Sequence, residues 1–237
     1  MAPKMRSWDT AKLPTGEQKA RAVQDMFDAI APRYDVVNRV MTFRLDVRWR
    51  RLTVRALRLP SESLVVDLAS GTGDFCRELT RSGYQPLSFD FSFGMLTADH
   101  SGAPRVQADA LTLPLPDASA DGVTCGFALR NFVDLRIFFA ELARVVRDGG
   151  RVALLDVSTP KNPLIRAGNN VYFGKIVPLI GAILSDAPAY RYLPRSVSYL
   201  PAAHELVRMF EESGFAEVEH SQLSGGLTQL LVGTRRR

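Results

Sequence analysis

Short β-branched runs alternate with helical segments through the middle of the chain, and this order leaves few folds open. The run 64–69 predicts a strand, 74–82 a helix and 86–90 a second strand. The series continues with a helix at 92–99, strands at 104–107 and 121–126, a helix at 134–147 and a strand at 151–157. Because parallel strands need crossover connections, this order predicts a parallel sheet with helices on both faces.

The end of the chain breaks the parallel order. A helix is predicted over 202–213, and strands over 215–221 and 227–234. The short Gly225-Gly226 turn joins these two strands, so we expect them to pair antiparallel. The predicted fold class is therefore α/β: a Rossmann-like, seven-stranded, mostly parallel sheet with one antiparallel strand and helices on both faces.

The segments outside this series define the expected domain organisation. Residues 1–20 are polar and predict a flexible N-terminal segment, whereas 21–237 predict one domain. Within it, 21–59 are expected to form helices, the first of them ended by Pro32. An insertion at 158–200 carries five prolines and several aromatic residues, and we expect it to cover the substrate site.

Composition and spacing exclude several classes of protein. Cys76 and Cys125 are too few for a disulfide framework, and three scattered histidines form no metal-ligand pattern, so we expect no metal site. No apolar run approaches the ~20 residues of a spanning helix, and the N-terminus lacks the apolar core of a secretion signal. We therefore expect a cytoplasmic protein. The net charge of +5 allows acidic ligands, anionic lipid or nucleic acid without choosing among them.

A predicted strand leads into a glycine turn and a helix in the stretch VVDLASGTGD at 65–74. Gly71 and Gly73 let the backbone turn tightly and approach a ligand, and the helix that follows offers free N–H groups. Asp90 ends the next strand, 17 residues after Gly73, where an acid in this topology bonds ribose hydroxyls. The pattern predicts a nucleotide-type site at the carboxyl ends of the strands.

The same residues distinguish between nucleotides. A dinucleotide fingerprint has a third glycine or alanine where this chain has Cys76, and Asp74 opposes a pyrophosphate. S-adenosylmethionine carries an ammonium and a sulfonium but no phosphate, so we expect Asp67 and Asp74 to receive or orient it. Asp109 follows the third strand and is expected beside the adenine amine, with a loop cap as the alternative.

Seven segments, spread over about residues 21–234, carry a further pattern. They read MFDAIAPRYDVVNR (26–39), VVDLASGTGDF (65–75), FDFSFGML (89–96), ADALTLPLPD (108–117), FALRNFVDL (127–135), SDAPAYRYLPRSVSYLP (185–201) and LSGGLTQLLVG (223–233). These segments resemble the ubiquinone/menaquinone biosynthesis C-methyltransferase family. The resemblance implies a class I methyltransferase domain that uses S-adenosylmethionine to methylate a ring carbon of a prenylated quinol. The expected substrate is demethylmenaquinol, with a benzoquinol of the ubiquinone pathway as the alternative.

The resemblance also implies particular site residues. It implies that Thr72, Asp90, Asp109 and Ala110 contact the cofactor. Gly126 stands where some members have serine, so only a backbone contact is expected at that position.

Arg130 and Asn131 follow the fourth strand, whose carboxyl end opens onto the crevice where such sheets bind ligands. Carbon methylation needs a ring made nucleophilic by loss of a hydroxyl proton, and ionising such a phenol at pH 7 costs about 4 kcal/mol. Because arginine stays protonated, Arg130 is predicted to stabilise the developing phenolate, and Asn131 to orient the ring oxygen or a water. The alternative for Arg130 is a surface ion pair with Asp134.

Substrate and surface contacts are predicted from less specific signals. Tyr34 and Tyr190 are expected to line the ring pocket, and the apolar stretch 176–184 to receive the isoprenoid tail, with core packing as its alternative. The Arg-rich helix 44–58 and the tail 235–237 are expected to contact the inner face of the cell membrane, with a solvated basic surface as the alternative. The apolar face predicted for this helix comprises Leu45, Trp49, Leu52, Ala56 and Leu59.

Other functions remain open from the sequence. A nucleic-acid partner is not expected, because the chain has FALRN at 127–131 where amino-group methylases carry an Asn/Asp-Pro-Pro-aromatic motif. A methyltransferase for another small molecule, such as a phenol or sterol, and a non-catalytic cofactor-binding subunit are the alternatives. The sequence leaves a homodimer open.

Overall fold

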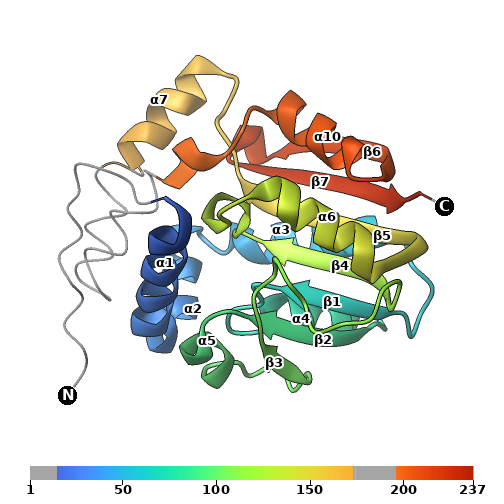
Figure 1. Ribbon diagram of the computed structural model, residues 1–237. Helices are drawn as coiled ribbons and strands as arrows, with labels where there is room; N and C mark the ends of the chain where they lie inside the picture. Colours follow the sequence, from blue (N-terminus) through green and yellow to red (C-terminus); the bar gives the residue numbers. More distant parts are fainter. Residues whose placement is uncertain (1–14, 173, 175–195, 237) are drawn as a thin grey trace.

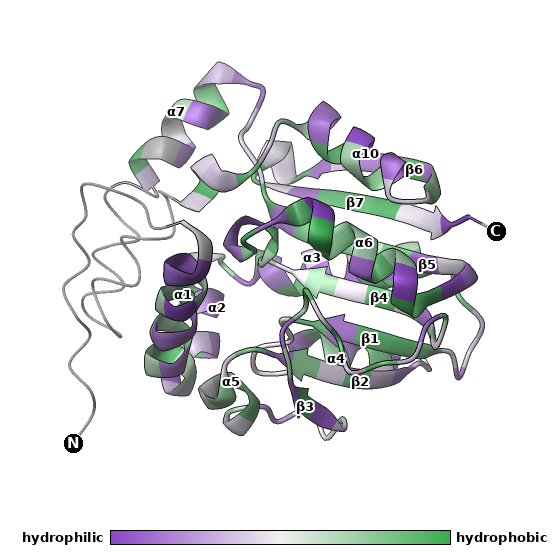
Figure 2. Cartoon of the chain, viewed as in Figure 1, coloured by the Kyte–Doolittle hydropathy of each residue, from purple (hydrophilic) through white to green (hydrophobic). Residues whose placement is uncertain are grey.

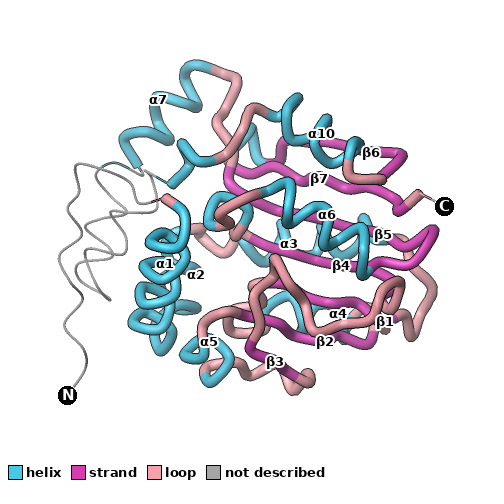
Figure 3. The backbone as a smooth tube through the Cα atoms, viewed as in Figure 1, coloured by secondary structure: helices cyan, strands magenta, loops and turns pink. Residues whose placement is uncertain are grey.

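The computed structural model describes residues 15–172, 174 and 196–236, and it contains one seven-stranded sheet of order β3-β2-β1-β4-β5-β7-β6 (Figures 1 and 3). The strands are β1 Leu64–Leu68, β2 Gln85–Asp90, β3 Arg105–Gln107, β4 Ala120–Gly126, β5 Val146–Val157, β6 Phe215–Leu223 and β7 Thr228–Arg235. Strands β1 to β5 pair in parallel, and β7 runs antiparallel to both β5 and β6. The predicted fold class is confirmed, and β7 is the one antiparallel strand.

The sheet is covered on both faces because side chains alternate along its buried central strands. On β5, Val152 and Leu154 join one cluster, which includes buried side chains of helices α6 Leu135–Val145 and α10 Ala203–Glu212. Ala153 and Leu155 join the other, with side chains of α3 Leu45–Leu57 and α4 Asp74–Arg81. Figure 2 shows the apolar strands enclosed between these helices.

The strand order reverses between β1 and β4, because β1 pairs with β2 on one side and with β4 on the other. A crevice forms at such a switch point, outside the carboxyl ends of the strands. Three short helical elements follow the strands there: α4, α5 Phe93–Thr97 after β2 and the 3-10 turn η2 Leu129–Asn131 after β4. Asp134 begins α6, since its carboxylate accepts the N–H groups of Arg136 and Ile137.

The N-terminal helices lie across this carboxyl edge (Figure 1). They are α1 Gly16–Ile30, the turn η1 Ala31–Arg33 and α2 Tyr34–Met41. Helix α1 begins five residues before the predicted start at Arg21, so 16–20 are not the expected flexible segment. The sequence pattern also missed α2: Pro32 was read as a stop, but it occupies the first turn of η1, where proline is tolerated.

Helix α3 buries a different face from the one predicted. The buried residues are Asp46, Trp49, Arg50, Thr53, Val54 and Leu57, and only Trp49 was expected among them. The polar residues can enter because Asp46 and Arg50 form an ion pair at 2.6 Å. Helix α6 also ends earlier than predicted, at Val145, and β5 begins at Val146 rather than at 151.

Helix α7 Pro163–Val171 and the turns η4 Val197–Tyr199 and η5 Ser224–Gly226 complete the described elements. Within the described residues, no helix is long and apolar enough to cross a membrane. The same residues contain no group of three or more side chains able to hold a metal ion. Tyr190 and the apolar stretch 176–184, both predicted substrate contacts, lie outside the described residues.

Candidate active site

The glycine turn between β1 and α4 has the left-handed backbone that its sequence predicts. Gly71 has φ +59° and Gly73 φ +79°. The N–H of Gly71 donates to Oδ2 of Asp90 at 2.8 Å, and Oδ1 of Asp90 accepts the N–H of Ser92, also at 2.8 Å. Asp90 therefore joins the turns that follow β1 and β2. Burial raises the pKa of its carboxyl to about 6, against the effect of the two N–H bonds.

A first cavity opens beside this turn, at the carboxyl ends of β1, β2 and β4. Helix α1 covers it with Ala20, Val23, Gln24 and Phe27. The described residues that line it include two carboxylates, Asp90 and Asp109, and no lysine, arginine or histidine. A cavity of this composition suits a ligand with positive charge or hydroxyl groups and opposes a pyrophosphate.

Most of the predicted cofactor residues line this first cavity. They are Gly71, Asp90, Asp109, Ala110 and Gly126, together with the predicted catalytic Asn131 and the predicted substrate residue Tyr34. Asp109 also makes the loop cap named as its alternative, since its Oδ1 accepts the N–H of Leu111 at 2.9 Å. The structure thus brings together positions that are 97 residues apart at their extremes, Tyr34 and Asn131.

Three predicted cofactor residues do not line the cavity. Asp67 is fully buried behind the turn, where it accepts hydrogen bonds from Thr124 at 2.8 Å and Cys76 at 3.6 Å. Burial raises the pKa of Asp67 to about 7, although the Thr124 bond acts to lower it. Thr72 donates its hydroxyl to Asp35 of α2, and a side chain on Gly73 would collide with Asp99.

Asp74 is committed to the protein rather than to a cationic ligand. Its carboxylate pairs with Arg39 at 3.0 Å, with Arg50 at 3.2 Å and with Arg77. Burial alone would raise the pKa of Asp74, but the guanidinium groups of Arg50 and Arg39 outweigh it and lower the pKa to about 2. The prediction that Asp74 orients the cofactor is therefore corrected: this acid ties α2 and α3 to α4.

A second cavity of about 580 Å³ adjoins the first. Phe27, Tyr34 and Phe127 line both cavities, so these three side chains form the boundary between them. The walls of the second cavity are mostly apolar, with Met26, Ile30, Met41, Trp49 and Leu227 among them. Burial raises the pKa of the Tyr34 phenol, which therefore stays protonated at neutral pH.

Arg130 lines the second cavity and Asn131 the first, so the two predicted catalytic residues face different spaces. Arg130 is 5% exposed and pairs with the fully buried Asp156 at the end of β5. Its Nη1 also donates to the carbonyl of Phe127 at 2.6 Å, and its Nε to Ser196 at 3.1 Å. No described residue accepts a hydrogen bond from Nη2. The alternative pair with Asp134 does not form, because Asp134 caps α6.

Two residues of this site escaped sequence reasoning. Asp156 stands at the carboxyl end of the fifth strand, a position that the strand pattern offers to a site residue, but a lone acid there is a weak signal. Phe127 adopts a left-handed backbone with φ +61°, and its ring lies 5.7 Å from the Arg50 guanidinium. A non-glycine residue with positive φ is costly, and such strain concentrates at functional sites.

Known proteins resemble both the sequence and the fold. The model of the ubiE/COQ5 methyltransferase family matches residues 14–235. A demethylmenaquinone methyltransferase of Roseiflexus castenholzii is 39% identical over 96% of this chain and 99% of its own length. A ubiquinone/menaquinone biosynthesis C-methyltransferase of Syntrophotalea carbinolica is 37% identical over 89% of this chain and 92% of its own.

Among solved structures, Haemonchus contortus phosphoethanolamine N-methyltransferase 2, in complex with S-adenosyl-L-methionine, matches with a TM-score of 0.58 at 12% identity. The match covers 79% of this chain and 52% of that one, and it shows a shared fold. The sequence matches show more, because they extend over nearly the whole chain at well above 30% identity. This chain belongs to the ubiE/COQ5 methyltransferase family.

Proposed function

We propose that this protein transfers a methyl group from S-adenosylmethionine to a ring carbon of a prenylated demethylquinol, converting demethylmenaquinol to menaquinol. The names of the relatives support this proposal. The observation that carries it is the pair of adjoining cavities: an acidic one at the glycine turn and a largely apolar one that holds a buried arginine. A donor and an acceptor can meet at the boundary formed by Phe27, Tyr34 and Phe127.

The first cavity fits S-adenosylmethionine by its donor and acceptor set. Asp90 offers carboxylate oxygens to ribose hydroxyls, and Asp109 to an exocyclic amine. The lack of a basic group among the described lining residues favours this cofactor over a dinucleotide. When bound, S-adenosylmethionine supplies an electrophilic methyl group on its sulfonium. Because Asn131 lines this cavity, we assign it to the cofactor rather than to the ring oxygen, as the sequence had predicted.

The second cavity fits a quinol through Arg130. Four hydrogen bonds hold this residue: two to Asp156, from the backbone N–H and Nη1, one to Phe127 and one to Ser196. Nη2 is left to donate to a ring oxygen, and a positive guanidinium there lowers the cost of ionising the hydroxyl. Asp156 makes burial of the guanidinium tolerable, since an unpaired charge inside a protein is strongly destabilising. Arg130 thus acts by electrostatic stabilisation and not as a base.

The walls of the second cavity determine how the quinol lies. Apolar side chains continue from Phe127 to Phe43 and Ile165 at the other end, so an isoprenoid tail can lie along them. Contact with apolar walls excludes water from the ring, which strengthens the interaction with Arg130. A tail anchored in this way orients the ring, so that its carbon faces the boundary with the first cavity.

The test is methyl transfer from labelled S-adenosylmethionine to two prenylated acceptors, a demethylnaphthoquinol and a benzoquinol, each reduced and oxidised. We expect transfer to the reduced naphthoquinol only, because the oxidised ring has no hydroxyl to ionise. Transfer to both reduced rings would extend the activity to the ubiquinone pathway. If neither acceptor is methylated while the protein still binds S-adenosylmethionine, the quinol assignment is wrong, and phenols and sterols become the next acceptors to try.

A further inference from the structure

Helix α7 is amphipathic, yet none of its residues is buried. Leu164 is 82% exposed, Val171 54% and Ile165 41%. The helix itself is well formed at its start, since the side chain of Asn162 accepts the N–H of Leu164 at 2.9 Å. Figure 1 shows α7 standing outside the layers that cover the sheet. An apolar helix side without a partner among the described residues calls for one outside them.

Helix α2 and the turn after it extend this apolar surface. Val36 and Val40 on α2 are 62% and 45% exposed, and Phe43 in the turn is 76% exposed. The Phe43 ring lies 5.9 Å from that of Tyr172, and the Tyr172 hydroxyl donates to the carbonyl of Met41 at 2.8 Å. We call this surface the apolar rim; its residues are Val36, Val40, Phe43, Leu164, Ile165 and Val171.

The exposed charges beside the rim are all positive. Arg33, Arg44 and Arg48 are exposed in the α2 region, and Lys161 and Arg166 are exposed around α7. The acidic residues of the same segments point inward: Asp35 accepts from Thr72, and Asp46 is buried in its ion pairs. An apolar surface edged by cations is complementary to an anionic bilayer. It disfavours a second copy of the chain, because a two-fold interface would set the same cations against one another.

The rim is continuous with the second cavity. Phe43 and Ile165 belong to both, and Tyr172 joins them from the cavity side. A lipid held in the cavity would therefore leave it through the rim.

We propose that the apolar rim docks this protein on an anionic lipid bilayer, with Val36 and Leu164 in the acyl region and Arg44 and Arg166 at the headgroups. The role of the contact in catalysis rests on the proposed function, since a prenylated quinol resides in the bilayer, but the contact itself does not.

This surface replaces the one predicted from the sequence. Beyond Arg48, arginines of α3 are engaged elsewhere: Arg50 with Asp46, Arg51 with Glu78 at 3.6 Å and Arg58 with Glu219 at 3.9 Å. Arg235 in the tail donates to the carbonyls of Ala143 and Gly214. Only the first turn of the Arg-rich helix takes part in the proposed contact.

The test is flotation with phosphatidylcholine vesicles, with and without phosphatidylglycerol, and no substrate. The full chain is expected to float with the anionic vesicles. The double variant Val36→Ser/Leu164→Ser should bind them about tenfold more weakly, because two apolar side chains leave the acyl region. The matched control Val106→Ser/Ile137→Ser removes one valine and one larger aliphatic residue from exposed positions on other elements, and should bind normally.

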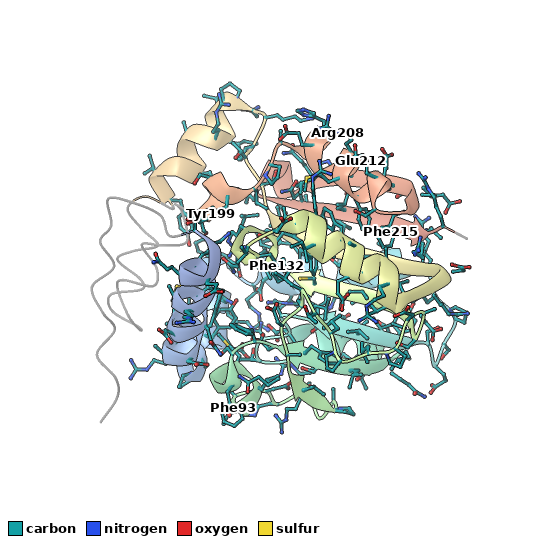
Figure 4. The ribbon with its side chains drawn as sticks, in the orientation of Figure 1. Phe93, Phe132, Tyr199, Arg208, Glu212 and Phe215 are labelled. Atoms are coloured by element: carbon teal, nitrogen blue, oxygen red, sulfur yellow. The ribbon has the colours of Figure 1, made fainter. Side chains whose placement is uncertain are left out.

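A second pair of variants tests the charges. Arg44→Gln/Arg166→Gln should lose the preference for anionic vesicles. Arg136→Gln/Arg208→Gln should keep it, because these exposed arginines lie on α6 and α10 and pair with Glu212 (Figure 4). The docking proposal is overturned if the full chain does not float, or if each control binds as weakly as its rim variant. It is also overturned if sedimentation shows a dimer that Val36→Ser/Leu164→Ser dissociates.

The docking and the reaction can fail separately. Val36 and Leu164 line neither cavity, so their double variant should methylate a short-tailed quinol at the normal rate in vesicle-free solution. Normal flotation without methylation of any quinol would refute the proposed function and leave the docking surface intact. Normal methylation without flotation would do the reverse.

Discussion

At the scale of single residues, Arg130 is the sharpest test of the site. Arg130→Gln/Asp156→Asn removes both members of the buried pair, so no uncompensated charge is left in the core. We expect kcat for quinol methylation to fall about 10²–10³-fold, the usual effect of removing one donor that stabilises a developing oxyanion. The loss should shrink as the pH rises, because hydroxide then ionises more of the quinol.

The measurement is the pH profile of kcat, beside the affinity for S-adenosylmethionine, which should stay within a few-fold of normal. Arg136→Gln, on the exposed side of α6, is the control. Near-normal turnover of the double variant with unchanged pH dependence would remove Arg130 from the mechanism.

Gly126 gives a second prediction at this scale. A Cβ at this position would overlap the ring of Phe75, so the serine that the resemblance associates with some members cannot enter unless the ring moves. Gly126→Ser alone should therefore lower the free energy of unfolding by about 1–3 kcal/mol, as overpacking usually does. Phe75→Leu makes room, so the double variant should lose less stability than the sum of the two single changes.

Urea unfolding of all four proteins provides the double-mutant cycle. Strict additivity would mean that Gly126 and Phe75 do not compete for the same space.

At the scale of elements, α2 is held over the glycine turn by polar contacts. Thr72 donates to Asp35, Arg77 lies 3.5 Å from the same carboxylate, and Arg39 bridges Asp46 and Asp74. The residue before Asp35 is Tyr34, which lines both cavities. These contacts therefore determine where α2 closes over the site.

This arrangement predicts that Thr72 acts on the cofactor through Asp35. Thr72→Val and Asp35→Ala should each weaken S-adenosylmethionine binding by up to about tenfold, and the double variant should bind no more weakly than either, because one hydrogen bond is lost in all three. Calorimetry measures the affinities, with the exposed Asp25→Ala on α1 as control. Weak binding by Thr72→Val beside normal binding by Asp35→Ala would show a direct contact, as the resemblance implies.

Elements governed by local pattern were predicted from the sequence, and those governed by distant partners were not. The strands of the sheet follow from runs such as 64–69 and from the Gly225-Gly226 turn, whose signals are contained within a few residues. Helix α3 was assigned the wrong buried face because Asp46 and Arg50 read as surface residues. Their burial depends on each other and on Asp74, which lies in another helix.

The candidate site divides in the same way. Gly71 and Asp90 were predicted correctly as cavity-lining positions, because the ends of parallel strands meet at one edge of the sheet. Asp67 and Thr72 stand in the same motif, but their side chains point to Thr124 and Asp35. The direction of a side chain within a turn depends on these tertiary partners, which the motif does not contain.

At the scale of the whole molecule, Lys19 joins three distant parts of the chain. It is 4% exposed, and its Nζ donates to the carbonyl of Phe132 at 2.8 Å and lies 3.8 Å from the centre of the Tyr199 ring. Figure 4 shows Phe132 and Tyr199 on either side of the start of α1. Its neighbour Ala20 lines the first cavity, so Lys19 helps to position α1 over the cofactor site.

Burial lowers the pKa of Lys19 from 10.5 to about 8. The folded protein therefore binds fewer protons than the unfolded chain between about pH 8 and 10.5. The cost of burying the charge is fully present below pH 8 and is relieved as the pH rises through this window. The stability that Lys19 contributes should accordingly rise with pH, by about 2–3 kcal/mol in total.

Lys19→Met keeps the apolar length of the side chain and removes the titration, so the variant should lack this rise. Urea unfolding at pH 7.5 and pH 10 (about neutral and about the upper end of the window) should show wild type gaining stability relative to Lys19→Met. The exposed Lys161→Met is the control and should follow wild type at both values. Parallel curves for wild type and Lys19→Met would mean that Lys19 reaches water in the folded protein. In that case α1 would not be held over the cavity by a buried ammonium, and its position would depend on the apolar contacts of Met26 and Ile30 alone.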